Sequence, residues 1–439
     1  MKIVLLSTYD LGHQPFGLAS PAAWLKGAGH QAICADLSVE VLPERAVREA
    51  GLIAFYLPMH IATRLAVPVI GRVKALNPAA KLCGFGLYAP LNAEYLRGLG
   101  MEFLLGGEFE PGLMALAGGS VPSDFVSLDR LSFRVPDRAG LPALSKYAQL
   151  RIGDESRVAG YTEASRGCKH LCRHCPIVPV YRGAFRIVQA EIVLADIRAQ
   201  IAAGARHITF GDPDFFNGPA HAVRIVQALH REFPDITYDA TIKIEHLLKR
   251  RDLLPLLKET GCLFVTSAVE SVDDAVLAKL DKGHTRRDFF EAAVLFRKAG
   301  LTLSPTFIPF TPWTTKESYR DLLAAIAHLG LIENVSPVQL ALRLLIPAGS
   351  LLLELPEIHD RIDGFDRAAL VYRWRHEDAE MDVLANTLLK LVGAAQKNGS
   401  SRRAIFREIW NLVHQRPLPE EFGLLPRAAI PYLNEPWYC

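Results

Sequence analysis

Three cysteines within eight residues are the strongest chemical signal in the sequence. Cys168, Cys172 and Cys175 lie in "SRGCKHLCRHCP" with the spacing CxxxCxxC. Thiolates this close together can hold one metal ion or one iron–sulfur cluster. A structural zinc site normally has four protein ligands, so zinc would need His170 or His174 as the fourth. A cubic cluster held by three cysteines instead keeps one iron open to another molecule, which would explain three cysteines and not four.

The other cysteines do not suggest a site of this kind. Cys34, Cys83 and Cys262 lie in apolar runs of strand length and are expected in the core. Seven cysteines in a chain of 439 residues also argue against a disulfide framework.

Short apolar runs alternate with helix-like segments over residues 1–117, and these units must position any ligand of this region. Five such units predict a flavodoxin-like, doubly wound parallel sheet, with ligands at the carboxyl ends of its strands. Residues 118–160 are rich in Pro, Gly and Ser and indicate a linker.

A second alternation follows, over residues 161–349, with strand candidates that end in "VQLALRLLI". Six βα units predict a partial (β/α)6 barrel, whose chemistry belongs at the carboxyl ends of the strands. The cysteine loop comes directly after the first of these strands, at the expected barrel mouth. Residues 350–439 are expected to form a small, mostly helical C-terminal domain.

The cysteine spacing, in this place on this barrel, resembles the hallmark loop of the radical SAM superfamily. The resemblance implies a [4Fe-4S] cluster on the three cysteines and S-adenosylmethionine (SAM) chelated to the open iron. Reductive cleavage of SAM would then give a 5′-deoxyadenosyl radical, with an external one-electron reductant of the flavodoxin or ferredoxin type as partner. His174 stands where the family often has an aromatic residue, which leaves the cluster ligands intact and puts His174 beside SAM.

The resemblance extends to the ends of the following strands. In "FGDPDFF", Asp212 or Asp214 would accept a hydrogen bond from the SAM ammonium group. The alternative is that the aspartate only caps a turn. In "TIKIEH", Lys243 would meet the SAM carboxylate, unless it is an exposed surface lysine. In "AVESVDDAVLAKLDKGHT", Glu270 would bind the ribose hydroxyls, and this is the strongest of the three matches.

A flavodoxin-like domain before such a barrel resembles the cobalamin-binding radical SAM proteins. Many cobalamin domains carry a DxHxxG motif whose histidine binds cobalt. Here "DLGHQPFG" offers His13 and Gly17, with spacings one residue too long. The cobalamin contacts would otherwise come from loops after the third, fourth and fifth strands: Met59, His60, Gly84, Gly86, Tyr88, Gly107 and Glu108. The alternative is that these loops only turn the chain and that the domain is a vestigial scaffold.

These patterns predict a cobalamin-dependent radical SAM methyltransferase acting on an unactivated centre of an unknown small molecule or peptide. A radical SAM enzyme of another reaction type, with a vestigial cobalamin domain, is the second hypothesis. A non-catalytic zinc module with three cysteine ligands and one histidine is the third. With a net charge of +2 and no apolar stretch near 20 residues, we expect a cytoplasmic protein with no nucleic-acid or membrane partner.

The ending "NEPWYC" resembles the CUAEP/CCAEP-tail radical SAM proteins, in which a cysteine precedes selenocysteine or a second cysteine. By that resemblance the natural chain would continue past Cys439 with selenocysteine. A UGA codon after Cys439, followed by codons for Ala-Glu-Pro, would support this hypothesis.

Overall fold

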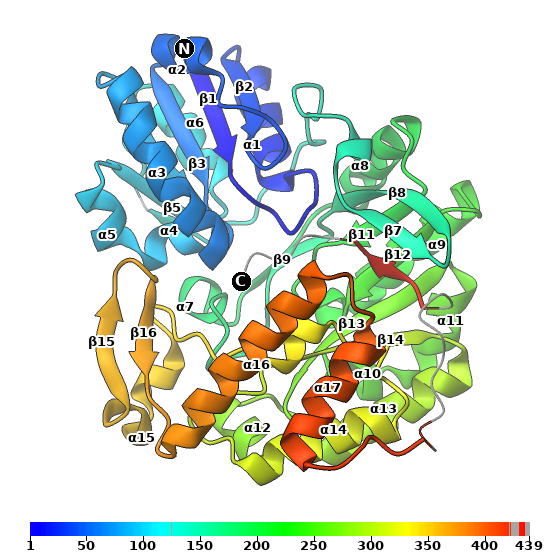
Figure 1. The fold of residues 1–439 in the computed structure, drawn as a ribbon. Coiled ribbons are helices and arrows are strands. Elements are labelled where there is room, and N and C mark those ends of the chain that lie inside the picture. The colour runs from blue at the N-terminus through cyan, green and yellow to red at the C-terminus, as the bar shows by residue number, and fades with distance from the viewer. Residues whose placement is uncertain (124, 421, 423–429, 435–439) are drawn as a thin grey trace.

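The computed structural model describes residues 1–123, 125–420, 422 and 430–434. Cys439, and with it the predicted tail motif, lies outside the described residues. Two α/β parts lie one above the other in Figure 1, the first strands and helices in blue and the barrel in green and yellow. None of the described helices combines the length and the apolar character that a membrane span requires.

The first part is built on a parallel sheet with the strand order β2-β1-β3-β4-β5-β6. An order of 2-1-3-4-5 is the flavodoxin order, which reverses direction between β1 and β3. The predicted flavodoxin-like sheet is therefore confirmed. Its strands read as almost continuous apolar runs because helices cover both faces. They are β1 (Lys2–Ser7), β2 (Gln31–Asp36), β3 (Leu52–Tyr56), β4 (Lys81–Phe85), β5 (Phe103–Gly107) and β6 (Val126–Ser127).

Two groups of helices cover this sheet. On one face, α1 (Phe16–Gly27) and α6 (Glu110–Ala117) share an apolar cluster with strand side chains such as Leu5 and Phe85. The opposite face packs against α2 (Glu44–Glu49), α3 (His60–Leu76), α4 (Tyr88–Leu91) and α5 (Ala93–Gly98). The carboxyl ends of the strands remain uncovered by these helices and face the second part of the chain.

The second part is a curled half-barrel sheet. Its order is β14-β13-β12-β11-β8-β7-β17, and the five strands from β8 to β14 in this row are parallel. Their bounds are β8 (Glu155–Thr162), β11 (His207–Phe210), β12 (Thr237–Thr241), β13 (Cys262–Glu270) and β14 (Thr302–Phe307). β7 (Gln149–Ile152) and β17 (Tyr432–Leu433) extend the open side with antiparallel pairing.

Helices alternate with these strands and cover the outer face of the half-barrel. They are α8 (Ala190–Ala202), α9 (Pro219–Glu232), α10 (Ile244–Lys249), α11 (Leu254–Glu259), α12 (Asp274–Leu280), α13 (Arg286–Ala299) and α14 (Lys316–His328). Between β8 and β11, the short strands β9 (Ser165–Gly167) and β10 (Phe185–Ile187) pair antiparallel around the cysteine loop and α7 (Val178–Tyr181).

The expected sixth barrel strand differs from the prediction. Within the described chain, residues 337–340 form a 3-10 helix, and the only pairing here is an isolated bridge between Phe310 and Arg343. Pro309 and Pro312 flank Phe310 and have no amide hydrogen to donate, so the edge beyond β14 cannot continue a regular ladder.

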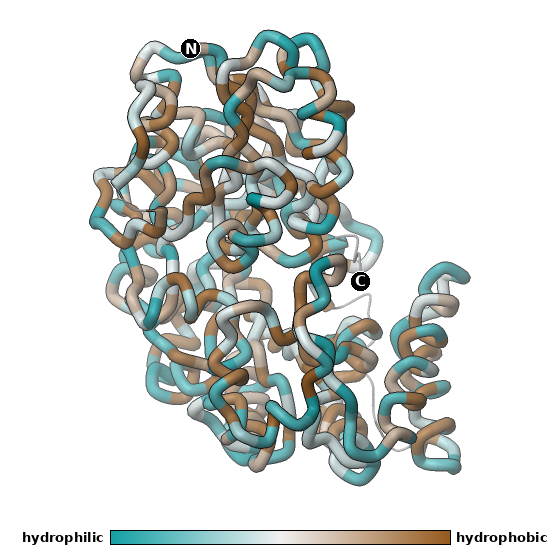
Figure 2. Tube along the Cα trace, turned by 90° about the vertical axis from the view of Figure 1, so that its left-hand side faces the viewer, coloured by the Kyte–Doolittle hydropathy of each residue, from teal (hydrophilic) through white to brown (hydrophobic). Residues whose placement is uncertain are grey.

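The C-terminal helices complete the core of the barrel. α16 (Ala379–Lys397) and α17 (Arg402–His414) bury their apolar faces in the same cluster as the barrel strands. Before them, α15 (Pro356–His359) leads into the hairpin of β15 (Ile362–Asp366) and β16 (Val371–Trp374). In the hydropathy view of Figure 2, the two parts form an upper and a lower lobe, with apolar stretches running through both interiors.

Candidate functional site

The cysteine loop is fixed by contacts with α12 before any metal is considered. The Arg173 amide donates to the Leu280 carbonyl at 2.9 Å, and the Arg173 guanidinium donates to the carbonyls of Ala278 and Lys279, each at 3.0 Å. These are the last carbonyls of α12, which have no partner within their own helix. On the other side, the Ser350 hydroxyl donates to the Arg173 carbonyl at 2.9 Å.

The spacing of the three thiols fits a cluster better than a single ion. Four ligands around one zinc at 2.3 Å would bring the sulfur atoms to about 3.8 Å from one another. Among the described residues, Cys168, Cys172 and Cys175 do not form a group with all ligand atoms within 4.8 Å. Thiolates that bind different irons of one cube lie farther apart, so these residues fit an iron–sulfur cluster.

The pKa values of these thiols indicate what binding requires. Burial raises the pKa of Cys175 to about 12, and burial also raises the pKa of Cys168. Repulsion from the neighbouring Cys172 contributes to both increases. Cys168 and Cys175 are therefore protonated at neutral pH and must release protons when a metal binds.

Neither histidine of the loop joins the thiols. His174 lies with Nε2 at 3.2 Å from Glu270 Oε1, and His170 lies with Nδ1 at 3.0 Å from Lys243 Nζ. His170 has contacts at both ring nitrogens, whereas His174 uses only Nε2 and its Nδ1 is buried without a partner among the described residues.

Glu270 is held in place at the end of β13. Its backbone has φ +67°, a left-handed conformation, at the point where the register with β14 shifts. Burial alone would raise the pKa of this carboxyl, but the Lys282 ammonium at 3.4 Å and the His174 ring lower the pKa to about 2. Glu270 is therefore a fixed, buried carboxylate beside the cysteine loop.

Lys243 begins a chain of polar contacts across the barrel mouth. Its ammonium donates to His170 Nδ1, His170 Nε2 lies 3.3 Å from His246 Nε2, and His246 Nδ1 lies 2.6 Å from Asp214 Oδ2. Lysine can only donate, so His170 accepts at Nδ1 and carries its ring proton on Nε2, whereas His246 Nδ1 and Asp214 Oδ2 lie close together without a hydrogen bond. One possible metal-ligand atom from each of His170, Asp214 and His246 also lies within 4.8 Å of the other two, as in a metal site. The hydrogen bond between the two rings already uses a nitrogen of each.

The other predicted carboxylate, Asp212, has a different set of partners. It accepts from the Ala164 amide at 2.9 Å and from the Ser165 hydroxyl, just before the cysteine loop. Burial raises its pKa to about 7 although these hydrogen bonds lower it. Asp212 thus ties the end of β11 to the chain that enters the loop.

The predicted cobalamin region lies at the carboxyl edge of the first sheet. A cavity of about 170 Å³ there is lined by Tyr56, Gly86 and Gly107 on one side and by Arg166 and Tyr181 on the other. Small-molecule pockets commonly have about 300–1,000 Å³, and a corrin with its side chains is larger than a drug-sized ligand. This cavity is smaller than a corrin, so cobalamin would need more space between the sheet edge and the barrel than this cavity has.

A buried ionic cluster fills much of this interface. The Arg166 guanidinium contacts Glu110 at 2.8 Å, Glu163 at 2.8 Å and Glu108 at 3.2 Å. Arg166 also lies 5.0 Å from the ring centre of Phe109, so its flat faces are covered as well. Glu108, predicted to meet cobalamin, instead binds the barrel.

Several other predicted cobalamin residues serve contacts within the chain. A Cβ on Gly17 would lie 2.2 Å from the Tyr56 ring, and Gly107 has φ +66° with the Ser127 carbonyl where its Cβ would be. Gly84 packs against core side chains, and Gly86 lies over the Leu57 carbonyl. Met59 immediately precedes α3 and is partly buried.

Of the three predicted aromatic or imidazole contacts, His60 and Tyr88 lie together and His13 lies elsewhere. His60 contacts the Ala369 carbonyl of the β15–β16 hairpin, and Tyr88 is buried with its ring 6.4 Å from that of His60. His13 is buried, stacks on Tyr161 at 4.7 Å between ring centres and lines a cavity inside the barrel. Burial lowers the pKa of His13 to about 4, so its ring is neutral.

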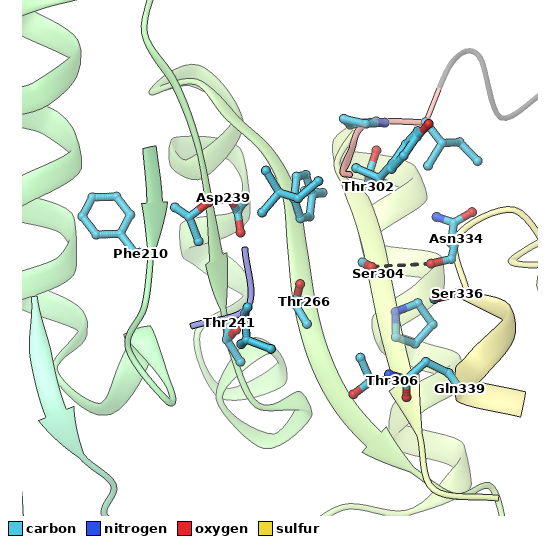
Figure 3. A pocket seen from close by; sticks show the side chains of 18 of the residues that line it. Phe210, Asp239, Thr241, Thr266, Thr302, Ser304, Thr306, Asn334, Ser336 and Gln339 are labelled. Atoms are coloured by element: carbon cyan, nitrogen blue, oxygen red, sulfur yellow. Dashed lines mark hydrogen bonds between the residues drawn. The ribbon is translucent and has the colours of Figure 1, made fainter. Parts of the chain in front are cut away.

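The barrel cavity was not anticipated from the sequence. It has about 280 Å³ and is lined by residues of β11 to β14 and of the segment 334–339, as Figure 3 shows. One signal was present: Thr302, Ser304 and Thr306 alternate along β14, and a strand places alternate residues on one face.

Comparison with known proteins agrees with this geometry. Residues 162–326 match the radical SAM superfamily. Hopanoid C-3 methylase of Methylococcus capsulatus is 26% identical over 226 residues, which are 52% of this chain and 42% of that protein. Ribosomal protein uS12 methylthiotransferase RimO of Syntrophotalea carbinolica is 26% identical over 234 residues, 51% of each chain. The chain thus spans about half the length or less of these curated relatives.

Two solved structures share the fold across both parts. The cobalamin-dependent SAM radical enzyme OxsB, solved with aqua-cobalamin and SAM, matches 91% of this chain and 67% of its own, with a TM-score of 0.71 and 14% identity. The radical SAM methyltransferase TsrM from Kitasatospora setae, solved with tryptophan substrate and a SAM analogue, matches 75% of this chain and 71% of its own, with a TM-score of 0.62 and 17% identity.

Proposed function

Residues 162–326 of the chain are a radical SAM domain, and from this premise we propose that the protein is an enzyme that reductively cleaves SAM. A domain of this kind implies a [4Fe-4S] cluster and SAM as cofactors. The observation that carries the proposal is the set of three thiols at the barrel mouth, in a loop docked on α12 and beside the fixed carboxylate of Glu270.

Cys168, Cys172 and Cys175 hold the cluster in this proposal. When bound, the cluster supplies the electron that cleaves SAM, and a cubic cluster on three cysteines has one iron free for it. Arg173 and Ser350 hold the loop in position, while the buried surroundings keep water from the reacting centre. The electron comes from an external one-electron donor of the flavodoxin or ferredoxin type.

Glu270 is the ribose-binding residue in this proposal. Its pKa of about 2 keeps it ionised at every physiological pH, so it can accept hydrogen bonds from both ribose hydroxyls. Lys282 neutralises part of its charge and fixes its orientation. Lys243 is the candidate for the SAM carboxylate, and it would have to exchange its contact with His170 for that carboxylate. Asp214 is the better candidate for the SAM ammonium group, because Asp212 is committed to Ala164 and Ser165.

Methyl transfer with cobalamin is the reaction type that the relatives support. OxsB, a cobalamin-dependent SAM radical enzyme, and TsrM, a radical SAM methyltransferase, both share the two-part fold. The hopanoid relative is also named as a methylase. In this proposal the substrate is methylated at an unactivated centre.

A second candidate is a radical SAM reaction without cobalamin. The observation that favours it is the closed interface: a cavity of about 170 Å³ beside the buried contacts of Arg166. In that case the first domain only stabilises the barrel and covers the cysteine loop.

Anaerobic reconstitution with iron, sulfide and added cobalamin tests both candidates. Wild-type protein should release 5′-deoxyadenosine from SAM under reducing conditions, and Cys172→Ala should abolish it. Cys34→Ala, which changes a buried cysteine of the first sheet, is the matched control and should leave the rate unchanged. S-adenosylhomocysteine together with corrin absorbance supports the methyltransferase, whereas deoxyadenosine alone supports the second candidate. Absence of both products would contradict the proposed function.

A further inference from the structure

The cavity inside the half-barrel has hydroxyl groups set among apolar side chains such as Phe210, Phe264 and Pro305. The interior of a βα barrel is usually filled by branched apolar side chains. Here the wall of a cavity of about 280 Å³ carries hydroxyls from β12, β13, β14 and the loop that follows α14 (Figure 3). They belong to Thr241, Thr266, Thr302, Thr306 and Ser336.

These five hydroxyls are not used by the protein itself. Within the part of the chain that the structure describes, none of them donates or accepts a side-chain hydrogen bond. All five residues line the same cavity. The five residues are partly buried, so their hydroxyls are open to the cavity and available to a partner that can hydrogen-bond.

Two amides add to this set. Asn334 is 9% exposed, and its Oδ1 is buried without a partner among the described residues. Gln339 uses Oε1 to accept from the Phe307 amide at 3.1 Å, which leaves its amide nitrogen for the cavity. Figure 3 shows both amides on the wall opposite β11 and β12.

The charged groups of the wall are already engaged. Asp239 accepts from His207 at 2.9 Å and from Thr209 at 2.7 Å. Arg402 donates to the Glu333 carbonyl at 3.0 Å and lies over the Tyr432 ring. The remaining basic group, the His13 ring, is neutral because burial lowers its pKa to about 4. Arg402 thus keeps its positive charge at the end of the cavity beside Tyr432, whereas the Thr and Ser side chains that line β12 to β14 are neutral.

The cavity reaches the level of the proposed SAM site. Thr306 pairs in register with Ala268, and the next residue of β14, Phe307, pairs with Glu270. Thr306 is thus one residue before the position on β14 that pairs with Glu270, the proposed ribose-binding residue. A molecule in the cavity would have its upper end close to the reacting part of SAM.

We propose that this cavity holds the reacting part of a small, uncharged substrate rich in hydroxyl groups, of the size of one sugar or cyclitol ring. A hydroxyl both donates and accepts, so a ring of hydroxyls is the best complement to a wall of hydroxyls. A hydrocarbon would leave these wall groups unpaired, which is unfavourable. The volume lies near the lower end of the range for small-molecule pockets. This inference rests on the proposed function, whose substrate class it names.

Ligand-observed NMR with three probes tests the inference: myo-inositol as the neutral polyol, gluconate as its charged counterpart and benzene as the hydrocarbon. Wild-type protein should bind myo-inositol, and more tightly than the other two. Thr266→Val/Thr306→Val keeps the side-chain volume but removes two hydroxyls, and should weaken myo-inositol binding roughly tenfold. Ser336→Ala removes only one hydroxyl and should weaken myo-inositol binding severalfold.

Thr387→Val is the matched control, because Thr387 is exposed on α16 and should not affect binding. Preferential binding of benzene or gluconate, no binding of myo-inositol, or equal binding by the wild type and the double variant would overturn the inference. SAM cleavage is measured on the same samples. Cleavage without myo-inositol binding removes only this inference, whereas myo-inositol binding without cleavage removes the proposed function.

Discussion

Glu270 adopts a backbone conformation that glutamate rarely has. With φ +67°, it costs about 1–2 kcal/mol relative to an ordinary strand residue. The contacts of its carboxylate with His174 and Lys282 hold the conformation. Strain of this kind is typical of functional sites, and here it aims the carboxylate at the space above the cysteine loop.

Replacing this carboxylate should affect SAM binding more than folding. Glu270→Gln keeps the volume but loses the charge that strengthens hydrogen bonds to the ribose hydroxyls, so SAM affinity should fall by about 1.5–3 kcal/mol. Calorimetric titration of the reconstituted protein with SAM measures this. Glu232→Gln, on the exposed face of α9, is the control. Equal affinities of Glu270→Gln and the wild type would remove Glu270 from the site.

At this scale, the sequence could predict the three cysteines because their spacing is local. The partners of His170 and His174 could not be predicted. Lys243 is 73 positions from His170, and Glu270 is 96 positions from His174. Such pairs form only when strands from distant parts of the chain come together at one edge of the sheet.

At the scale of the elements, the cysteine loop depends on α12. Arg173 binds two carbonyls at the end of that helix with its side chain and a third with its amide, and one of the three, Ala278, also accepts from the Asp281 amide. A cation at a helix C-terminus is also favoured by the helix dipole. The loop is therefore ordered before a cluster is inserted.

Removing the guanidinium should loosen this loop. Arg173→Met keeps the apolar stem but loses two charge-assisted hydrogen bonds, so the stability of the docked loop should fall by roughly 2–4 kcal/mol. Hydrogen exchange of residues 168–176 in the metal-free protein should then be faster, and the iron content after reconstitution lower. Arg182→Met, an exposed arginine after α7, is the control. Unchanged exchange in Arg173→Met would mean that other contacts hold the loop.

The order of the first sheet follows from apolar runs and short connections, and the sequence predicted it correctly. The sixth barrel strand was not correctly predicted. Its segment has the apolar pattern of a strand, but the neighbouring edge around Phe310 has two prolines and allows only an isolated bridge. Strand formation depends on a partner as much as on the segment itself.

For the whole molecule, the contact between the first domain and the barrel is ionic and buried. One guanidinium, Arg166, faces the three carboxylates of Glu108, Glu110 and Glu163. Burial raises the pKa of Glu108 to about 7, while Arg166 lowers it. The sequence could not indicate this cluster, because its members come from two domains more than 50 positions apart.

The raised pKa makes the stability of this interface depend on pH. The folded protein holds a proton on Glu108 up to about pH 7, whereas the unfolded chain loses it near pH 4.5. The free energy of unfolding should therefore fall as pH rises from about 4.5 to about 7, by up to about 3 kcal/mol from this group. Glu108→Gln should abolish that part of the pH dependence in denaturant titrations. A pH profile unchanged by the substitution would contradict the raised pKa.

The central claim is that three thiols hold a cubic cluster with one iron open to SAM, and electron paramagnetic resonance of the reduced, reconstituted protein with and without SAM tests it most directly. We expect the signal of a reduced [4Fe-4S] cluster that changes shape when SAM is added, with about four irons per chain. The signal should be lost in Cys168→Ala, Cys172→Ala and Cys175→Ala. A protein with one zinc per chain and no such signal, or a cluster signal that SAM leaves unchanged, would contradict the claim.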